Sequence, residues 1–165
     1  MSADPRSRAQ RRRDTEHRLT HDVDVWVASA SADGAPHLVP LSFDWDGEAL
    51  LLATPTDSPT GRNLAATRTV RLGLGHTRDA SMIEGDVEVL ETHALPRDQG
   101  DRFAARSGFD PRALATPYRW FRVTPRRIQA WREVNEMAGR DLMRDGRWLI
   151  DDRTHGVSDG ATDQG

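Results

Sequence analysis

The sequence predicts a mainly β protein, a β-barrel with a few short helices. Apolar residues take every second position in several short stretches between residues 22 and 132, which is the pattern of half-buried strands. Asp-Gly pairs at residues 33–34 and 46–47 separate the first of these stretches, and this dipeptide is a strong signal for a hairpin turn. Six or seven strands joined mostly by hairpins indicate a barrel or a sandwich, and their hairpin-linked order favours the barrel.

The first three predicted strands span residues 22–54. Asp22–Ala30 alternates three Val residues with Asp and Trp, and Pro36–Trp45 alternates again. Glu48–Thr54 is a continuous apolar run, which suits a strand buried on both faces. Pro40 lies inside the second strand, and because proline cannot donate a ladder hydrogen bond, we expect an edge, a bulge or a break there.

Two further strands and a short helix follow. The composition of Pro55–Thr60 indicates a loop, and Gly61–Thr67 a short helix. Thr69–His76 resumes the alternation, and Ser81–Thr92 is the longest predicted strand, with Gly85 as the candidate for a bulge. The acidic residues on one face of this last strand are interpreted as a solvated face, and they are Glu84, Asp86 and Glu88.

The last third of the chain predicts shorter elements. Leu95–Ser107 is expected to be helical, with Pro96 near its first turn. Two strands, Tyr118–Thr124 and Arg126–Arg132, are expected on either side of Pro125. Beyond them we expect a short helix at Val134–Leu142 and a last short strand or turn at Gly146–Ile150.

The length indicates one domain with distinct ends. Residues 1–20 form an Arg-rich arm or a short helix from about Arg8 to Leu19, residues 21–150 the barrel, and residues 151–165 an acidic tail that is expected to be disordered. The favoured interpretation of the Arg-rich start is a solvated helix or arm. A contact with nucleic acid or an acidic partner is the alternative.

Composition excludes several kinds of site. All 23 basic residues are Arg, so the chain cannot form a Schiff base with pyridoxal phosphate or supply the Lys of a Walker loop. The absence of Cys excludes thiol nucleophiles and thiolate metal sites. The six His are interpreted as lacking a metal spacing such as His-x-x-x-His on one helix, so no zinc or iron site is expected. His37 is interpreted as a packed or partly exposed strand residue rather than a catalytic group or haem ligand.

Charge and hydropathy bear on partners and location. The net charge of -3 argues against a general nucleic-acid binder, so a nucleic-acid partner is not favoured. No apolar run approaches the roughly 20 residues that span a bilayer, and the basic start has no apolar segment behind it. We therefore expect no membrane association and a cytoplasmic location.

Three stretches together resemble a known family. They are DVWVASASADGAPHLVPLSFDWDGEALLLATP, DSPTGRNLAATRTVRLGLGHTRDASMIEGDVEVL and YRWFRVTPRRIQAWRE, which lie between Val23 and Glu133. They resemble the pyridoxamine 5'-phosphate oxidase-like, FMN-binding split-barrel proteins. The resemblance implies a six-stranded split barrel and a homodimer with two cofactor sites at its interface. FMN is the implied cofactor, with the deazaflavin coenzyme as the alternative and haem as a less favoured one.

The resemblance also implies site residues. The flavin ring would lie beside the second strand, at Val39, Pro40, Leu41, Ser42 and Phe43. The phosphate would be reached from the next strand end and loop, at Thr54, Ser58, Thr60, Arg62, Asn63 and Leu64. Thr60 stands where the family usually has Lys, so the phosphate would depend on Arg62, on hydroxyl groups and on amides at the start of the following helix.

Several of these residues have a structural alternative. Ser58 and Thr60 suit helix capping, and Arg62 and Asn63 suit a surface position and a helix start. The resemblance allows Trp131 to stack near the flavin ring from the partner subunit, and core or dimer packing is the alternative.

The implied function is a flavin-binding oxidoreductase that moves a hydride or electrons between FMN and a small organic substrate. The end of the chain, RDGRWLIDDRTHGVSDG, does not resemble the substrate-holding segment of true pyridoxamine phosphate oxidases, so vitamin B6 oxidation is not expected. A deazaflavin-dependent reductase and a non-catalytic cofactor-binding protein are the alternatives. No catalytic residue is assigned.

Overall fold

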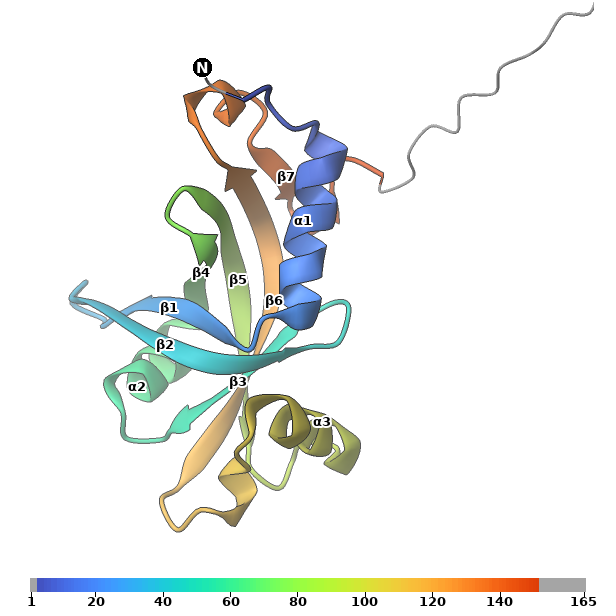
Figure 1. Ribbon diagram of the computed structural model, residues 1–165. Helices are drawn as coiled ribbons and strands as arrows, with labels where there is room; N and C mark the ends of the chain where they lie inside the picture. The colour runs from blue at the N-terminus through green and yellow to red at the C-terminus, as the bar shows by residue number, and fades with distance from the viewer. Residues whose placement is uncertain (1–2, 152–165) are drawn as a thin grey trace, which may run out of the picture.

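Six antiparallel strands form a closed barrel in the computed structural model, which describes residues 3–151 (Figure 1). The sheet runs in the order β3-β2-β1-β4-β5-β6, and a further pairing of β3 with β6 closes it. The predicted mainly β barrel is therefore confirmed. The barrel strands are β1 (Asp24–Ala30), β2 (Pro36–Trp45), β3 (Leu50–Pro55), β4 (Thr69–His76), β5 (Asp79–Glu91) and β6 (Tyr118–Trp131). All but the first residue of the predicted acidic tail lies outside the described residues.

The barrel is split along β2. Only Phe43–Trp45 of this strand pair with β3, while its first part, Pro36–Ser42, pairs with β1 alone among the described residues. Pro40 lies in this first part, opposite Trp26. Pro40 has no backbone N–H to donate, and it therefore lies on a strand with an unpaired edge, as the sequence predicts.

β6 is one continuous strand, and the prediction of two strands around Pro125 is wrong. The register of β5 and β6 shifts at Glu84/Gly85, where Gly85 pairs with Pro125. This bulge takes up the proline without ending the strand, and it confirms the bulge predicted at Gly85. At 14 residues, β6 is also longer than β5, which was expected to be the longest strand.

The segment after β6 is not helical, and the prediction of a helix at Val134–Leu142 is wrong. A single 3-10 turn at Val134–Glu136 is followed by β7 (Asp141–Arg144), which pairs with β6. Gly139, at φ +68°, interrupts any helical continuation. β8 (Arg147–Trp148) completes a hairpin whose turn, Asp145-Gly146, has positive φ at both residues, and it lies within the predicted last strand or turn.

Three helices lie on the barrel: α1 (Arg8–His21), α2 (Pro59–Thr67) and α3 (Arg97–Ser107). α1 confirms the predicted short helix near the N-terminus, and Figure 1 shows it alongside β6 and β7. One face of α1 is buried, through Arg11, Thr15 and Leu19. The interpretation of residues 1–20 as a solvated arm is therefore wrong for this face.

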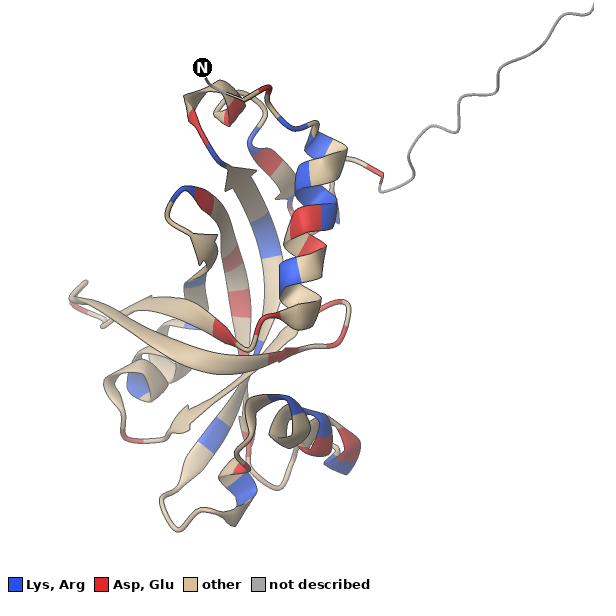
Figure 2. Ribbon diagram, viewed as in Figure 1, with Lys and Arg blue, Asp and Glu red and all other residues tan. Residues whose placement is uncertain are grey.

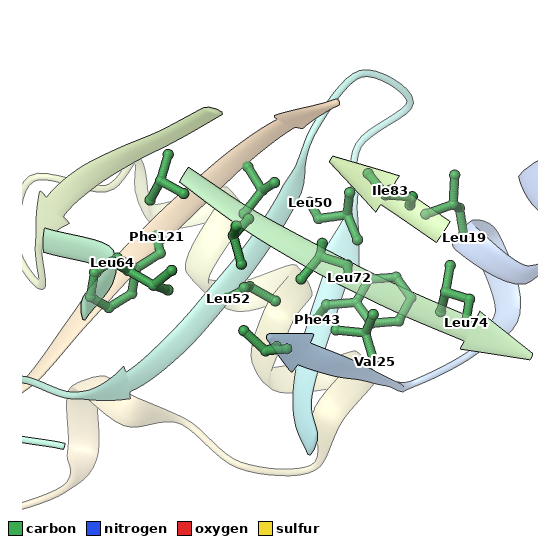
Figure 3. Close-up of a cluster of buried hydrophobic side chains, with 14 of the residues drawn as sticks. Leu19, Val25, Phe43, Leu50, Leu52, Leu64, Leu72, Leu74, Ile83 and Phe121 are labelled. Atoms are coloured by element: carbon green, nitrogen blue, oxygen red, sulfur yellow. The ribbon is translucent and has the colours of Figure 1, made fainter. Parts of the chain in front are cut away.

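The inward-facing side chains of the six strands form the core, and Leu19 of α1 and Leu64 of α2 complete it at two sides (Figure 3). A second cluster beneath α3 contains Phe103 and Trp120, whose rings meet edge to face at 5.0 Å between centroids. The two clusters pack against β2 and β3, the strands that diverge around the split.

A row of ion pairs covers the outer face of β5 and β6; we call it the β5–β6 row. The pairs are Arg119–Glu91, Arg122–Glu88, Arg126–Asp86, Arg127–Glu84 and Arg132–Asp79, at 2.9 to 3.7 Å. Figure 2 shows the acidic residues along β5 beside the basic residues of β6. The acidic face of β5 is thus an outer face, as predicted, but each of its carboxylates pairs with a guanidinium group.

Candidate functional site

A pocket of 310 Å³ lies where β2 and β3 diverge; we call it the β2–β3 pocket. Beyond Phe43–Trp45, β2 continues along β1, whereas Ala53–Pro55 of β3 continue along the start of β6. The split of the barrel therefore creates the pocket. Its lining residues are Asp24, Pro40, Leu41, Ser42, Ala53, Thr54, Pro55, Phe109 and Tyr118.

Four residues that the sequence assigns to cofactor binding meet in this pocket, namely Pro40, Leu41, Ser42 and Thr54. The Ser42 hydroxyl donates to Asp24 Oδ1 at 2.8 Å, which fixes the direction of its lone pairs. Proline, leucine, alanine and aromatic side chains form the other walls. The pocket therefore combines apolar walls with a few polar groups, as ligand sites commonly do.

Ser58 caps α2 beside the pocket. Its hydroxyl accepts the Gly61 amide at 3.0 Å and donates to the Pro55 carbonyl at 2.8 Å. Thr54 Oγ1 lies 3.0 Å from Ser58 Oγ, and because the Ser58 proton is directed at Pro55, Thr54 is the donor of this pair. The capping alternative for Ser58 is confirmed.

The start of α2 offers little room for a phosphate. A Cβ on Gly61 would lie 2.4 Å from the Pro55 carbonyl oxygen and 3.1 Å from that of Thr56, so the preceding loop closes over the helix start. Thr60, at the position of the family's Lys, is 2% exposed. Both loop carbonyls present negative ends of dipoles, which disfavours an anion at this point.

Arg62 is the cation that the sequence assigns to the phosphate. It is exposed, and its Nη1 donates to the Asp57 carbonyl. Among the residues that the structure describes, Asp24 is the one charged residue that lines the pocket. A phosphate in this pocket would meet no cationic side chain of the described lining unless Arg62 left Asp57 and turned toward it.

Four other predicted residues do not line the pocket. Val39 packs against the core from β2, and Phe43 and Leu64 are fully buried in it. Asn63 is buried, and its Nδ2 donates to Ser29 Oγ of β1 at 3.1 Å. Within this chain, Val39, Leu64 and Asn63 thus contact the barrel itself.

Trp131 lies elsewhere, in an apolar groove of 590 Å³ on the outer face of β1, β4, β5 and β6; we call it the apolar groove. Trp26, Leu38 and Met82 line the same groove and are 52%, 61% and 42% exposed. Trp131 ends β6 whereas Tyr118 begins it. Within one chain, the structure therefore does not bring Trp131 to the β2–β3 pocket.

Two aromatic residues of the β2–β3 pocket were not predicted from the sequence. Tyr118, the single Tyr of the chain, reaches the pocket because it pairs with Pro55 of β3. Phe109 follows the α3 cap at Gly108 and packs edge to face on Phe103 at 5.5 Å. Both placements depend on tertiary contacts, for which the local sequence carries no signal.

The histidines differ in one respect from the expectation. His17 and His21 are four residues apart on α1, and their rings stack with 4.1 Å between centroids, so a His-x-x-x-His spacing does occur. Residues 3–151 contain no group of three or more His, Cys, Asp or Glu side chains placed to hold a metal ion. His37 is half-buried on β2, opposite Ser29.

Comparison with known proteins identifies related sequences and folds. A family model described as pyridoxamine 5'-phosphate oxidase matches residues 17–132. No curated protein matches the chain. Within residues 3–151, no helix has the length and apolar character needed to cross a membrane.

Several solved structures share the fold at low identity. A structure named F420 reductase is 22% identical, with a TM-score of 0.56 over 68% of this chain and 94% of its own. A Clostridium acetobutylicum protein related to general stress protein 26, of the pyridoxinephosphate oxidase family, is 16% identical, with a TM-score of 0.57 over 76% and 91% of the two chains. HutZ, the heme storage protein from Vibrio cholerae, is 15% identical, with a TM-score of 0.53 over 68% and 88%. These structures support a common split-barrel architecture.

Proposed function

The chain belongs to the pyridoxamine 5'-phosphate oxidase family, and from this premise we propose that it is a flavin-binding oxidoreductase that works as a homodimer. FMN is the proposed cofactor and a small organic molecule the proposed substrate. The observation that carries this proposal is the β2–β3 pocket, where the split of the barrel gathers Pro40, Leu41, Ser42 and Thr54.

The pocket suits one face of a planar, partly polar ring. Its 310 Å³ volume falls at the lower end of the range of about 300–1,000 Å³ for small-molecule sites. Pro40 and Leu41 offer apolar contact, and Ser42, held by Asp24, offers a hydroxyl oxygen of fixed direction. A bound flavin would supply the hydride or electron transfer, and these side chains would orient it and exclude water.

The phosphate depends on Arg62. The guanidinium group suits bidentate phosphate binding, and its hydrogen bond to a backbone carbonyl leaves its charge without a carboxylate within 4 Å in the described part of the chain. Thr54 and Ser58 already donate their hydroxyl protons, to Ser58 and to the Pro55 carbonyl, so the phosphate would rely on Arg62. Arg62 thus takes the part of the missing Lys in this proposal.

The apolar groove supports the homodimer. Trp26, Leu38 and Met82 expose large apolar side chains on one outer face, and contiguous apolar patches of this kind mark interaction sites. A second copy that covers this face would bury Trp131 against it. The partner's surface would also border the open side of the β2–β3 pocket, because Leu38 and Pro40 lie on the same face of β2.

The second candidate is a reductase that uses the deazaflavin coenzyme. The structural likeness to F420 reductase favours it, with 94% of that chain covered. The same pocket would hold the deazaflavin ring. A third candidate, a non-catalytic cofactor-binding protein, finds support in the likeness to the heme storage protein HutZ.

Cofactor titration separates these candidates. Natively purified protein is examined by absorbance spectroscopy and then titrated with FMN, deazaflavin coenzyme and haemin. FMN binding at micromolar or tighter affinity supports the proposal, and preference for deazaflavin or haemin supports the corresponding alternative. If none of the three binds, the oxidoreductase proposal fails.

Arg62→Gln tests the phosphate site. We expect about tenfold weaker FMN binding and unchanged binding of riboflavin, which lacks the phosphate. Arg68→Gln, at the other end of the same helix, is the matched control and is expected to change neither affinity. Equal FMN affinity in wild type and Arg62→Gln would remove Arg62 from the site.

A further inference from the structure

A second polar pocket, of 240 Å³, lies between the start of α1, the outer face of β6 and β7; we call it the arginine pocket. Figure 1 shows α1 and β7 side by side, away from the start of β6, where Tyr118 lines the β2–β3 pocket. Its charged and polar lining consists of Arg8, Arg127, Gln129, Arg140, Asp141 and Arg144. Four guanidinium groups therefore surround one carboxylate.

Asp141 is already fully engaged. It accepts hydrogen bonds from Arg144 at 2.6 Å, from Gln129 at 2.7 Å and from Arg127 at 3.1 Å. These bonds, the one from Arg144 above all, lower the pKa of Asp141 to about 2, so that it is ionised at neutral pH. Its single charge is shared by Arg127 and Arg144, and Arg127 also lies 3.7 Å from Glu84.

Arg8 and Arg140 are not balanced in this way. Arg8 Nη2 donates to the Asp141 backbone carbonyl at 2.5 Å, and Arg140 Nη1 donates to the Met137 carbonyl at 3.4 Å. Neither group has a carboxylate within 4 Å among residues 3–151. Two guanidinium charges thus line the pocket, and their hydrogen-bond partners are backbone carbonyl groups rather than carboxylates.

The Arg8 side chain is also held in place, and one of its N–H donors has no partner. Its Nε is buried and has no hydrogen-bond partner in the described structure. A Cβ on Gly139 would lie 3.4 Å from Arg8 Cδ, so the glycine loop forms a close seat for this side chain. This seat holds the Arg8 side chain at the wall of the arginine pocket.

We propose that the arginine pocket binds the phosphate group of a small molecule, with Arg8 and Arg140 as the principal donors. Guanidinium groups bind phosphate oxygens through paired N–H donors, and two of them approaching from α1 and from the loop before β7 suit a tetrahedral anion. This site does not depend on the flavin proposal, since it shares no residue with the β2–β3 pocket.

Calorimetric titration of the full-length chain tests the proposal. Inorganic phosphate and the monoester glycerol 3-phosphate are the probes, and sodium chloride of equal ionic strength is the blank. We expect saturable binding of phosphate, and about tenfold weaker binding in Arg8→Gln and in Arg140→Gln. Tighter binding of the monoester identifies a phosphorylated metabolite as the ligand class, and tighter binding of phosphate identifies the free ion.

Arg13→Gln is the matched control, because Arg13 is an exposed residue of the same helix outside the pocket and the substitution removes the same charge. Arg140→Gln loses one long hydrogen bond only, so it keeps the test valid if Arg8→Gln fails to fold, which circular dichroism reports. Absence of saturable binding, or equal weakening in Arg13→Gln, would overturn the proposal. Either result is independent of whether FMN binds.

Discussion

Glu136 links the segment before α1 to the turn after β6 through one buried side chain. It is 2% exposed, and Arg6 Nε and Nη2 donate to its two oxygens at 3.0 and 2.8 Å. The backbone amides of Arg6 and Arg132 donate to it as well. Arg6 also binds Asp14 of α1 and Asp79 of β5, so this one carboxylate anchors a network between the N-terminus, α1 and the turn after β6.

Stability is expected to fall at acid pH because of Glu136. The hydrogen bond from Arg6 lowers the Glu136 pKa from 4.5 to about 2. An acid whose pKa is lower in the folded state stabilises the fold above its unfolded pKa, and this contribution is lost as the pH falls from about 4.5 to about 2. Such a shift corresponds to on the order of 3 kcal/mol at neutral pH.

Urea unfolding at several pH values measures this contribution. Glu136→Gln is expected to reduce the free energy of unfolding at pH 7 and to flatten its dependence below pH 4.5. Glu88→Gln, which removes an exposed carboxylate of the β5–β6 row, serves as the control and is expected to cost less than about 1 kcal/mol. Parallel pH curves for wild type and Glu136→Gln would contradict the assignment.

Gly85 and Gly73 differ in how much space their strands allow. A Cβ on Gly85 would lie 2.4 Å from Val123 Cγ1 in the core, whereas a Cβ on Gly73 would make ordinary contacts with Met82 and Trp26 at 3.6 and 3.7 Å. We expect Gly85→Ala to destabilise the protein by roughly 1–3 kcal/mol through overpacking, and Gly73→Ala to be nearly neutral. Thermal and urea unfolding compare the two, and equal effects would contradict the close packing at the bulge.

At the scale of elements, α1 and the β5–β6 row differ in how much they contribute to the stability of the fold. The pairs in the row are mostly exposed, and exposed ion pairs contribute little each. α1 instead buries Leu19 in the barrel core and Thr15 against Ser81, with 2.8 Å between their hydroxyl oxygens. Arg106 of α3 then donates to the Leu19 and Asp22 carbonyls and so fastens the helix end. α1 is therefore part of the folded unit rather than an appendage.

Leu19→Ala tests this role of α1. Leu19 is fully buried, so its truncation is expected to cost about 2–5 kcal/mol. Leu114→Ala is the matched control, because Leu114 is 47% exposed and its truncation should cost well under 1 kcal/mol. Equal unfolding free energies for the two variants would show that α1 does not support the barrel.

At the scale of the whole molecule, the outer surface is divided by chemistry. Charged pairs cover β5 and β6 toward Glu91, while the apolar groove lies over β1, β4 and the opposite ends of β5 and β6, around Trp26 and Met82. Small residues such as Gly73 and Ala80 line the groove and allow close approach of a second surface. This division is what the homodimer proposal uses.

Sedimentation velocity tests the assembly. We expect the wild type to sediment as a dimer, and Trp26→Asp to shift it toward the monomer because a carboxylate would be buried in the interface. Leu114→Asp, an exposed position outside the groove, should leave the dimer intact. A monomeric wild type at micromolar concentration would refute the proposal.

The sequence predicted much of the fold because the signals for strands and turns come from neighbouring residues. The alternating strands, both Asp-Gly turns, the edge at Pro40 and the bulge at Gly85 all follow from side-chain period or backbone chemistry. The same reasoning misjudged Pro125, since a proline that usually ends a strand is tolerated when a glycine across the ladder yields a bulge. It predicted a helix after β6 because it lacked the pairing of β7 with β6, which overrides local preference.

The candidate site shows the same division. The resemblance of the sequence to a family supplied Pro40, Leu41, Ser42 and Thr54, which the structure gathers in one pocket. Tyr118 joins them because β3 pairs with β6, which lies far from it in the chain, and Phe109 joins them because it packs on Phe103 and Tyr118. Composition likewise determined that every Lys or Arg position of the chain is Arg.

The sequence by itself thus determined the strands, the turns and an all-arginine chemistry, because each follows from neighbouring residues or from composition. The tertiary structure alone decided which arginines are balanced: Arg6 finds Glu136 at 130 positions' distance, whereas Arg8 and Arg140 meet only backbone carbonyls. The physical reason is that the free energy of a charge depends on what surrounds it in space, and barrel closure sets those surroundings.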